Sequence, residues 1–209
     1  MNSLILVRHG NTFNSGKEAT WVGRNEDLPL VESGHEQARA IASAVAECGF
    51  NSIRIYSSPL KRAKETASQL EGDIEILSEL NEIDYGNWGG KSTEELLAMG
   101  LKDEIASWDR EAIIPEEGWG STPHELTIQI STFLDRCREE LGESPIVAIT
   151  SNGFLKLLAK QVLSDFPKLC EEGRLKVKTG HLCELRLSNG NWEVASWGVS
   201  PKEWAGERG

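Results

Sequence analysis

The chain has 209 residues, a formal net charge of -11, 39% hydrophobic residues and 26% charged residues, which suits one sizeable globular α/β domain. The acidic balance argues against nucleic acid or an anionic membrane surface as the main partner. An anionic ligand must therefore be drawn in by a local basic pocket. The longest apolar runs, 4–7 and 146–149, are far too short to span a membrane.

The cysteines and the first residues bear on the compartment. The four cysteines form no CxxC pair, so we expect reduced thiols and neither a zinc site nor a redox motif: Cys48, Cys137, Cys170 and Cys183. Arg8 and His9 come before the apolar core of a signal peptide could form. The sequence therefore favours a cytoplasmic protein without a metal or cofactor.

The first predicted element is a buried strand over Leu4–Val7, which stops abruptly at Arg8, His9 and Gly10. Open α/β sheets place their ligand crevice at the carboxyl ends of such strands. Arg8 can direct two N–H groups to a phosphate, and a neutral ring nitrogen of His9 can attack phosphorus. Gly10 lets the backbone approach a ligand closely because it has no Cβ.

A helix and a second strand–turn–helix unit are predicted next. Ser33 is expected to cap the helix that runs to Cys48, with Glu36 completing a capping box. A strand over 53–56 is followed by a Ser-Ser-Pro turn and a helix over 60–70. Arg62 lies in the first turn of that helix, where a cation is unfavourable unless an anion is bound. Ser57 could hydrogen-bond the same anion.

The remaining elements alternate between helices and short strands. We predict a short strand over 74–77, an irregular loop over 79–90, and a helix over 92–99 capped by Ser92. Residues 100–122 are loosely patterned. A long amphipathic helix, a buried strand, a second polar turn and helix, and a hairpin turning at Asn189-Gly190 follow: 123–141, 146–149, 150–163 and 183–197. Without repeats or linkers, residues 1–209 are expected to form a single domain.

In this order the motifs resemble the histidine phosphatase superfamily, which includes the cofactor-dependent phosphoglycerate mutases. The resemblance covers most of the chain and rests on an ordered set of segments: Arg8-His9-Gly10 with Thr12, Asp27-Leu28-Pro29-Leu30, Gly34-His35-Glu36-Gln37-Ala38, Ser57-Ser58-Pro59-Leu60-Lys61-Arg62-Ala63 with Glu65-Thr66, Leu80-Asn81-Glu82-Ile83, and Tyr85-Gly86-Asn87-Trp88. It implies a three-layer α/β/α fold with a mostly parallel sheet.

The resemblance also implies a reaction in two steps. His9 would attack a phosphoryl group and become phosphohistidine, and water would then release phosphate. Arg8 and Arg62 would hold the phosphoryl oxygens. Glu82 would protonate the leaving oxygen and then activate water, a role that requires a raised pKa; Asp84 is a rival acid. The implied substrate is a small phosphorylated metabolite, and a homodimer is a possible assembly.

One departure concerns the family's usual second histidine, which is replaced by Asn152 in the turn Ser151-Asn152-Gly153. An Asn amide can donate to a phosphoryl oxygen, but it carries no charge. Either Asn152 serves as a neutral donor, which we favour, or His181 reaches in and supplies the lost cation. The N–H of Gly153 at the helix start is expected to bind the anion as well. Asn14 is also assigned to phosphate binding.

The sequence offers three rival interpretations, of which the cysteine phosphatase is rejected. A mutase needs extra cations, and segment 91–122 offers few of them: Lys91, Lys102 and Arg110. The stretch from Cys48 to Arg54 fits Cys-x5-Arg, but its expected order of helix, turn, strand is wrong for thiol phosphatase chemistry. A protein that kept phosphate-ligand binding and lost catalysis is the non-enzymatic alternative. Several side chains are candidates for a leaving-group pocket, although tryptophans are more often core: Trp21, Arg24, Trp88, Trp108 and Trp119.

Overall fold

The computed structural model describes residues 3–142 and 144–208. Their strands form one six-stranded sheet in the order β3-β2-β4-β1-β5-β6. The four strands from β3 to β1 run parallel, while β5 is antiparallel to β1 and β6 to β5. The sheet is therefore mixed and mostly parallel, with these bounds: β1 Ser3–Arg8, β2 Arg54–Ser57, β3 Ile74–Ile76, β4 Ile146–Thr150, β5 Leu182–Ser188 and β6 Asn191–Val199.

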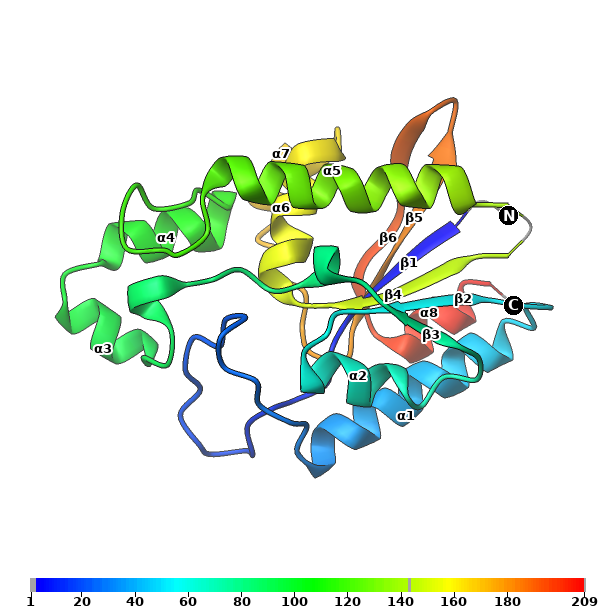
Figure 1. Ribbon diagram of the computed structural model, residues 1–209, viewed down its shortest axis with the longest axis horizontal. Helices are drawn as coiled ribbons and strands as arrows, with labels where there is room; N and C mark the ends of the chain where they lie inside the picture. Colours follow the sequence, from blue (N-terminus) through cyan, green and yellow to red (C-terminus); the bar gives the residue numbers. More distant parts are fainter. Residues whose placement is uncertain (1–2, 143, 209) are drawn as a thin grey trace.

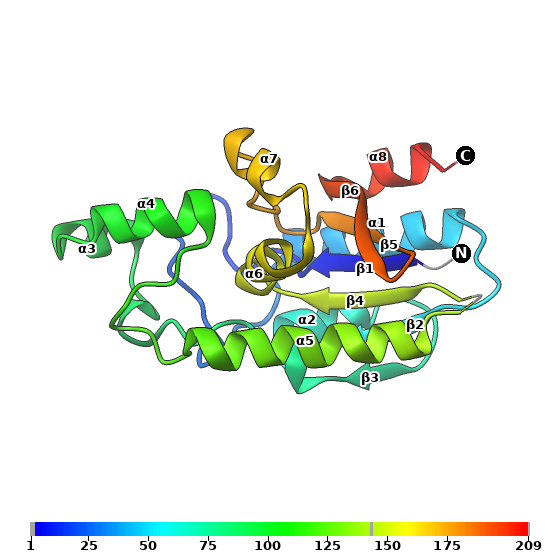
Figure 2. The ribbon, with the colours of Figure 1, turned by 90° about the horizontal axis from the view of Figure 1, so that it is seen from above.

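Helices cover both faces of the sheet, as Figure 1 and Figure 2 show. Alternate residues of β1 belong to different cores: Leu4 and Leu6 pack with α5 and α6, whereas Ile5 and Val7 pack with α1, α2 and α8. This burial on both faces explains the continuous apolar run of the strand. The expected three-layer α/β/α class is confirmed, with these helices: α1 Glu32–Glu47, α2 Lys61–Ala67, α5 Pro123–Glu140, α6 Asn152–Val162 and α8 Pro201–Gly206.

A helical lobe of α3 (Thr93–Ala98) and α4 (Lys102–Glu111) lies beyond the carboxyl ends of the central strands, at the left of Figure 1. The predicted cap of α3, Ser92, is confirmed, and it belongs to a capping box in which the Ser92 hydroxyl accepts from Glu95 N–H and the Glu95 carboxylate accepts from Ser92 N–H. Two 3₁₀ turns lead into the lobe, η1 (Ser78–Leu80) and η2 (Gly86–Trp88).

Several expected elements differ from the structure. Ser33 does not cap α1, whose N-cap is Val31; the Ser33 hydroxyl instead accepts a hydrogen bond from the Asn11 side chain, 3.2 Å away. Helix α2 ends at Ala67, before the expected Leu70. Helix α4 lies within the segment interpreted as loosely patterned, and the sequence analysis also missed α7 (Phe166–Glu171) and α8. The described helices include none with the length and apolarity to cross a membrane.

Candidate active site

The site is built at the carboxyl ends of β1 and β4. These strands pair in parallel with Arg8 opposite Thr150, and the N–H of His9 donates to the Thr150 carbonyl at 3.0 Å. The chain therefore leaves both strands at the same edge of the sheet, where it places His9 beside the first turn of α6. His9, Arg8, Glu82 and Asn152 all line a cavity of about 350 Å³ at this edge.

Hydrogen bonds with Gly10 and Arg62 hold the imidazole of His9 in one tautomer. Nδ1 lies 2.7 Å from the Gly10 carbonyl, which can only accept, so Nδ1 carries the proton. Nε2 then has the lone pair, and it accepts from Arg62 Nε at 3.1 Å. Burial, together with the charges of Arg62 and Arg8, lowers the pKa of His9 well below its ordinary value. The ring is therefore neutral, as a nucleophile must be.

The two arginines are held mainly by backbone carbonyls. Arg62 on α2 is 1% exposed and donates to the carbonyls of Glu26 and Gly23 at 2.8 and 3.1 Å. Arg8 donates to the Val177 carbonyl at 2.6 Å, while its buried Nε has no partner among the described residues. Two guanidinium groups beside a neutral imidazole make a site complementary to a phosphoryl group.

Glu82 lies between the two 3₁₀ turns and is 5% exposed. Its carboxylate accepts from Ile83 N–H at 2.9 Å and from Gly153 N–H at 3.2 Å. Burial raises the pKa of Glu82, and this outweighs the opposing effects of those two hydrogen bonds and of Arg62 and Arg8. A buried glutamic acid beside the histidine can supply a proton.

This arrangement corrects the expectation for Gly153. Its N–H does not point to a free anion site, because it is already donated to Glu82. The glycine serves this contact in a second way, since a Cβ at position 153 would lie 2.3 Å from Glu82 Oε1. Only a residue without a side chain allows the carboxylate to approach the start of α6 so closely.

Asn152 faces the cavity with a defined orientation. Its Oδ1 accepts from Val177 N–H at 3.0 Å, so the amide nitrogen forms the opposite end of the group and keeps its N–H donors for a ligand. The same Val177 holds Arg8 through its carbonyl. One backbone segment thus positions both side chains.

Besides Gly153, four expected binding residues do not line the cavity. Gly10 donates its N–H to Thr66 Oγ1, and a Cβ there would lie 2.4 Å from the Gly34 carbonyl oxygen, so its missing side chain serves packing against α1. Asn14 is exposed. Ser57 is fully buried and donates to the Ser58 carbonyl. His181 is half-buried, with its Nδ1 at 3.3 Å from the Thr179 carbonyl.

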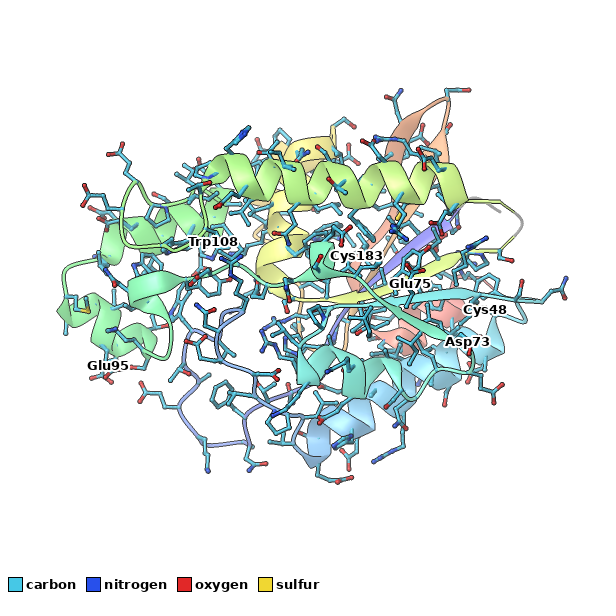
Figure 3. The ribbon with its side chains drawn as sticks, in the orientation of Figure 1. Cys48, Asp73, Glu75, Glu95, Trp108 and Cys183 are labelled. Carbon is cyan, nitrogen blue, oxygen red and sulfur yellow. The ribbon has the colours of Figure 1, made fainter. Side chains whose placement is uncertain are left out.

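The outer wall of the cavity comes largely from the loop after β1 and from the helical lobe. Trp21 and Trp108, two of the expected pocket residues, line it, whereas Arg24, Trp88 and Trp119 do not. Figure 3 shows Trp108 on the inner side of α4. The sequence analysis assigned no role to several other wall residues: Phe13, Tyr85, Asp109, Lys176 and Thr179. Two of these carried a signal, because Tyr85 stands within the Tyr85–Trp88 segment that supports the resemblance and the Thr179-Gly180 pair also resembles the family.

The cysteine alternative fails on geometry. Cys48 is the C-cap of α1 and Arg54 begins β2, so the thiol lies at the negative end of a helix. Burial raises the pKa of Cys48, which opposes thiolate formation. Figure 3 places Cys48 at the end of the molecule opposite the helical lobe.

The fold and site together define a three-layer α/β protein of the histidine phosphatase type. Residues 4–200 match the histidine phosphatase superfamily (branch 1), and the chain therefore belongs to this superfamily. Its members are phosphatases or mutases, and the relatives include both kinds.

Two curated relatives illustrate this range. The chain is 33% identical over 175 residues to a 2,3-bisphosphoglycerate-dependent phosphoglycerate mutase of Parvibaculum lavamentivorans, covering 75% of this chain and 78% of the relative. It is 30% identical over 159 residues to phosphoserine phosphatase 1 of Hydrogenobacter thermophilus, covering 72% and 71%.

Solved structures show the same fold. A phosphoserine phosphatase of Entamoeba histolytica in complex with 3-phosphoglyceric acid superposes with a TM-score of 0.75 at 24% identity, covering 95% of this chain and 97% of the other. A mycobacterial glucosyl-3-phosphoglycerate phosphatase gives a TM-score of 0.76 at 22% identity, covering 95% and 99%.

Proposed function

We propose that this protein is a phosphomonoesterase that hydrolyses a small phosphorylated metabolite through a phosphohistidine at His9. The observation that carries the proposal is the neutral His9 ring, whose Nε2 accepts from the buried Arg62 and which lines the same cavity as Arg8 and the buried Glu82. The arrangement supplies a nucleophile, an anion-binding pair and a proton donor in one cavity.

In the first step, Nε2 attacks phosphorus while the bond from phosphorus to the leaving oxygen breaks. The incoming phosphoryl group takes over the N–H donors of Arg62, which releases the lone pair of His9. Arg8 and Arg62 stabilise charge on the non-bridging oxygens. Glu82 transfers its proton to the leaving oxygen, so the alcohol departs neutral and the carboxylate is left charged.

In the second step, the Glu82 carboxylate removes a proton from water. The resulting oxygen attacks the phosphohistidine, the N–P bond breaks, and inorganic phosphate leaves. Glu82 is protonated again and His9 returns to its neutral form. Each residue is thereby restored for another cycle.

A mutase is the second candidate, since one curated relative carries that name. A mutase must hold a second anionic group while the phosphorylated intermediate turns around. Apart from Arg8, the cavity wall contributes one cation, Lys176, together with the carboxylate of Asp109 and the aromatic rings of Phe13, Trp21 and Trp108. This weak cationic lining favours transfer to water.

The test is the release of phosphate from a generic aryl phosphate, combined with labelling of the chain by a phosphorus-labelled substrate. We expect acid-labile phosphohistidine in the wild type, and complete loss of both label and turnover in His9→Ala. His124→Ala is the matched control, because His124 is an exposed residue in the first turn of α5. A folded His9→Ala protein that still releases phosphate would contradict the mechanism, and binding without turnover in the wild type would favour the non-enzymatic alternative.

A further inference from the structure

On one side of the cavity, the start of α6 presents Asn152, a neutral side chain at the position where the resemblance implies a second histidine. Tyr85 faces the same side. A Cβ at Gly153 would lie 2.7 Å from the Tyr85 hydroxyl oxygen and 2.3 Å from Glu82 Oε1. The phenol and the catalytic carboxyl therefore meet at one point beside Asn152.

The ring of Tyr85 is fixed in place. It is 6% exposed, and three tryptophan rings pack against it nearly edge to face, with centroids 5.4 Å away for Trp21, 4.9 Å for Trp119 and 6.4 Å for Trp108. An aromatic ring clamped in this way points its hydroxyl in one direction. Tyr85 lines the cavity, whereas the hydroxyl of the other tyrosine, Tyr56, is hydrogen-bonded to Glu140.

The surroundings keep this hydroxyl protonated. Burial and the charge of Glu82 raise the pKa of Tyr85 well above its ordinary value, while Arg8 and Arg62 oppose the shift only in part. The phenol is therefore a hydrogen-bond donor and not a base at neutral pH. The charges of Glu82, Arg8 and Arg62 all affect the pKa of Tyr85, which agrees with its position near these three side chains.

We propose that the Tyr85 hydroxyl is a further catalytic group that donates a hydrogen bond to a non-bridging oxygen of the transferring phosphoryl group. With the amide nitrogen of Asn152 it forms a pair of neutral donors in place of the missing cation. The O–H bond of Tyr85 stays intact throughout, so no proton is transferred through it. This inference rests on the proposed function and adds a residue to its site.

The first experiment compares Tyr85→Phe with Tyr56→Phe, which removes the other phenolic hydroxyl of the chain. We expect Tyr85→Phe to slow single-turnover phosphorylation of His9 by roughly 10- to 100-fold, the size expected for losing one hydrogen bond to a charged group. Orthovanadate, measured by calorimetry, is expected to bind roughly 10-fold more weakly. Tyr56→Phe should change neither quantity, and melting curves report whether both variants are folded.

Two further readouts separate a catalytic role from a packing role. A donor to a non-bridging oxygen affects aryl phosphates with good and poor leaving groups by the same factor, whereas a group that assists Glu82 has a larger effect on poor leaving groups. Adding Asn152→His to Tyr85→Phe restores a cation on this side, so we expect it to recover most of the lost rate. A purely structural defect would not be rescued in this way.

The outcomes distinguish the two proposals. Unchanged phosphorylation rates and vanadate affinity in folded Tyr85→Phe overturn the role of Tyr85 and leave the proposed function intact. If the wild type forms no phosphohistidine, the proposed function fails; weaker vanadate binding by Tyr85→Phe then still supports the donor role, and unchanged binding overturns it. A wild type that does not bind vanadate overturns both.

Discussion

His9 and Glu82 share a buried setting that shifts their pKa values in opposite directions. Burial disfavours the charged form of each group, so it lowers the pKa of the imidazole and raises that of the carboxyl. The arginines oppose the shift of Glu82 and reinforce that of His9. Burial thus favours a neutral base and a protonated acid in one site, the pair that the proposed first step uses.

The pH dependence of this step follows from those directions. Glu82 must be protonated, so the rate is expected to fall as pH rises through its raised pKa, while the acidic limb from His9 lies well below the ordinary value of 6.5. Glu82→Gln should lose the alkaline limb and slow an alkyl phosphate far more than a nitrophenyl phosphate, whose leaving group needs no proton. Single-turnover rates across a pH series provide the measurement. An alkaline limb that persists in Glu82→Gln would assign it to a group other than Glu82.

For single residues, the sequence predicts proximity to the site better than it predicts the direction of each side chain. Arg8, His9 and Glu82 line the cavity as expected, and Arg62 bonds to His9. Gly10 is next to His9 in the chain, yet it faces the first turn of α1, where Gly34 leaves no room for a Cβ. Neighbouring residues at a strand end diverge, and only the packing of distant elements decides which of them faces the ligand.

Among the elements, α6 and α4 are joined by two lysines one turn apart. Lys156, which is fully buried, donates to the Trp108 carbonyl at 3.1 Å and to Asp109 Oδ1 at 3.0 Å. Lys160 donates to the carbonyls of Glu111 and Ala112 at 3.1 and 3.0 Å. Cations at these last carbonyls of α4 are favourable. Since α6 begins at the site and Trp108 lines the cavity, these contacts set the position of the wall.

Replacing Lys156 therefore tests how the lobe is attached. We expect Lys156→Met to lower the free energy of unfolding by about 1–3 kcal/mol, because the Trp108 carbonyl keeps only its bond from Ala112 N–H and Asp109 loses its buried partner, while the volume is kept. Lys160→Met is the control, with a loss below about 1 kcal/mol for its more exposed bonds. Urea unfolding gives both values, and KM for an aryl phosphate should rise in Lys156→Met as Trp108 shifts. Equal effects from the two variants would contradict a special role for the buried lysine.

Elements with strong local signals were predicted well, and the misses have physical causes. The apolar runs of β1 and β4 and the capping box of α3 are encoded within a few residues. Helix α4 buries only Ile105 and Trp108, so its sequence carries little periodicity. The cap of α1 was misplaced because Ser33 hydrogen-bonds to Asn11, which lies 22 residues earlier in the chain. A local sequence pattern does not reveal such a contact.

For the molecule as a whole, the buried Glu184 on β5 connects the two ends of the described chain. It accepts hydrogen bonds from Ser3 at the start of β1 at 2.9 Å, from Trp204 of α8 at 2.9 Å and from Arg208 at 3.1 Å. Arg186 adds a further contact at 3.1 Å. A carboxylate buried in this way is stable because every partner donates to it.

The same contacts predict how the fold responds to acid. Burial alone would raise the pKa of Glu184, but hydrogen bonds from Arg208, Trp204 and Ser3 outweigh it and lower the pKa to about 2. Because the folded pKa is below the ordinary value of 4.5, the stabilisation is present above that value and is lost as pH falls through about 2. We expect Glu184→Gln to lower the free energy of unfolding by about 2–4 kcal/mol at neutral pH.

In strongly acidic buffer the wild type and Glu184→Gln should converge, because both then carry an uncharged side chain at this position. The control is Glu193→Gln on β6, an exposed glutamate whose replacement should leave the unfolding curves unchanged at either pH. Denaturant unfolding in both buffers measures the difference. A gap between wild type and Glu184→Gln that is the same in acid and at neutral pH would mean that the hydrogen-bond geometry of this side chain, and not its charge, holds the two ends of the chain on β5.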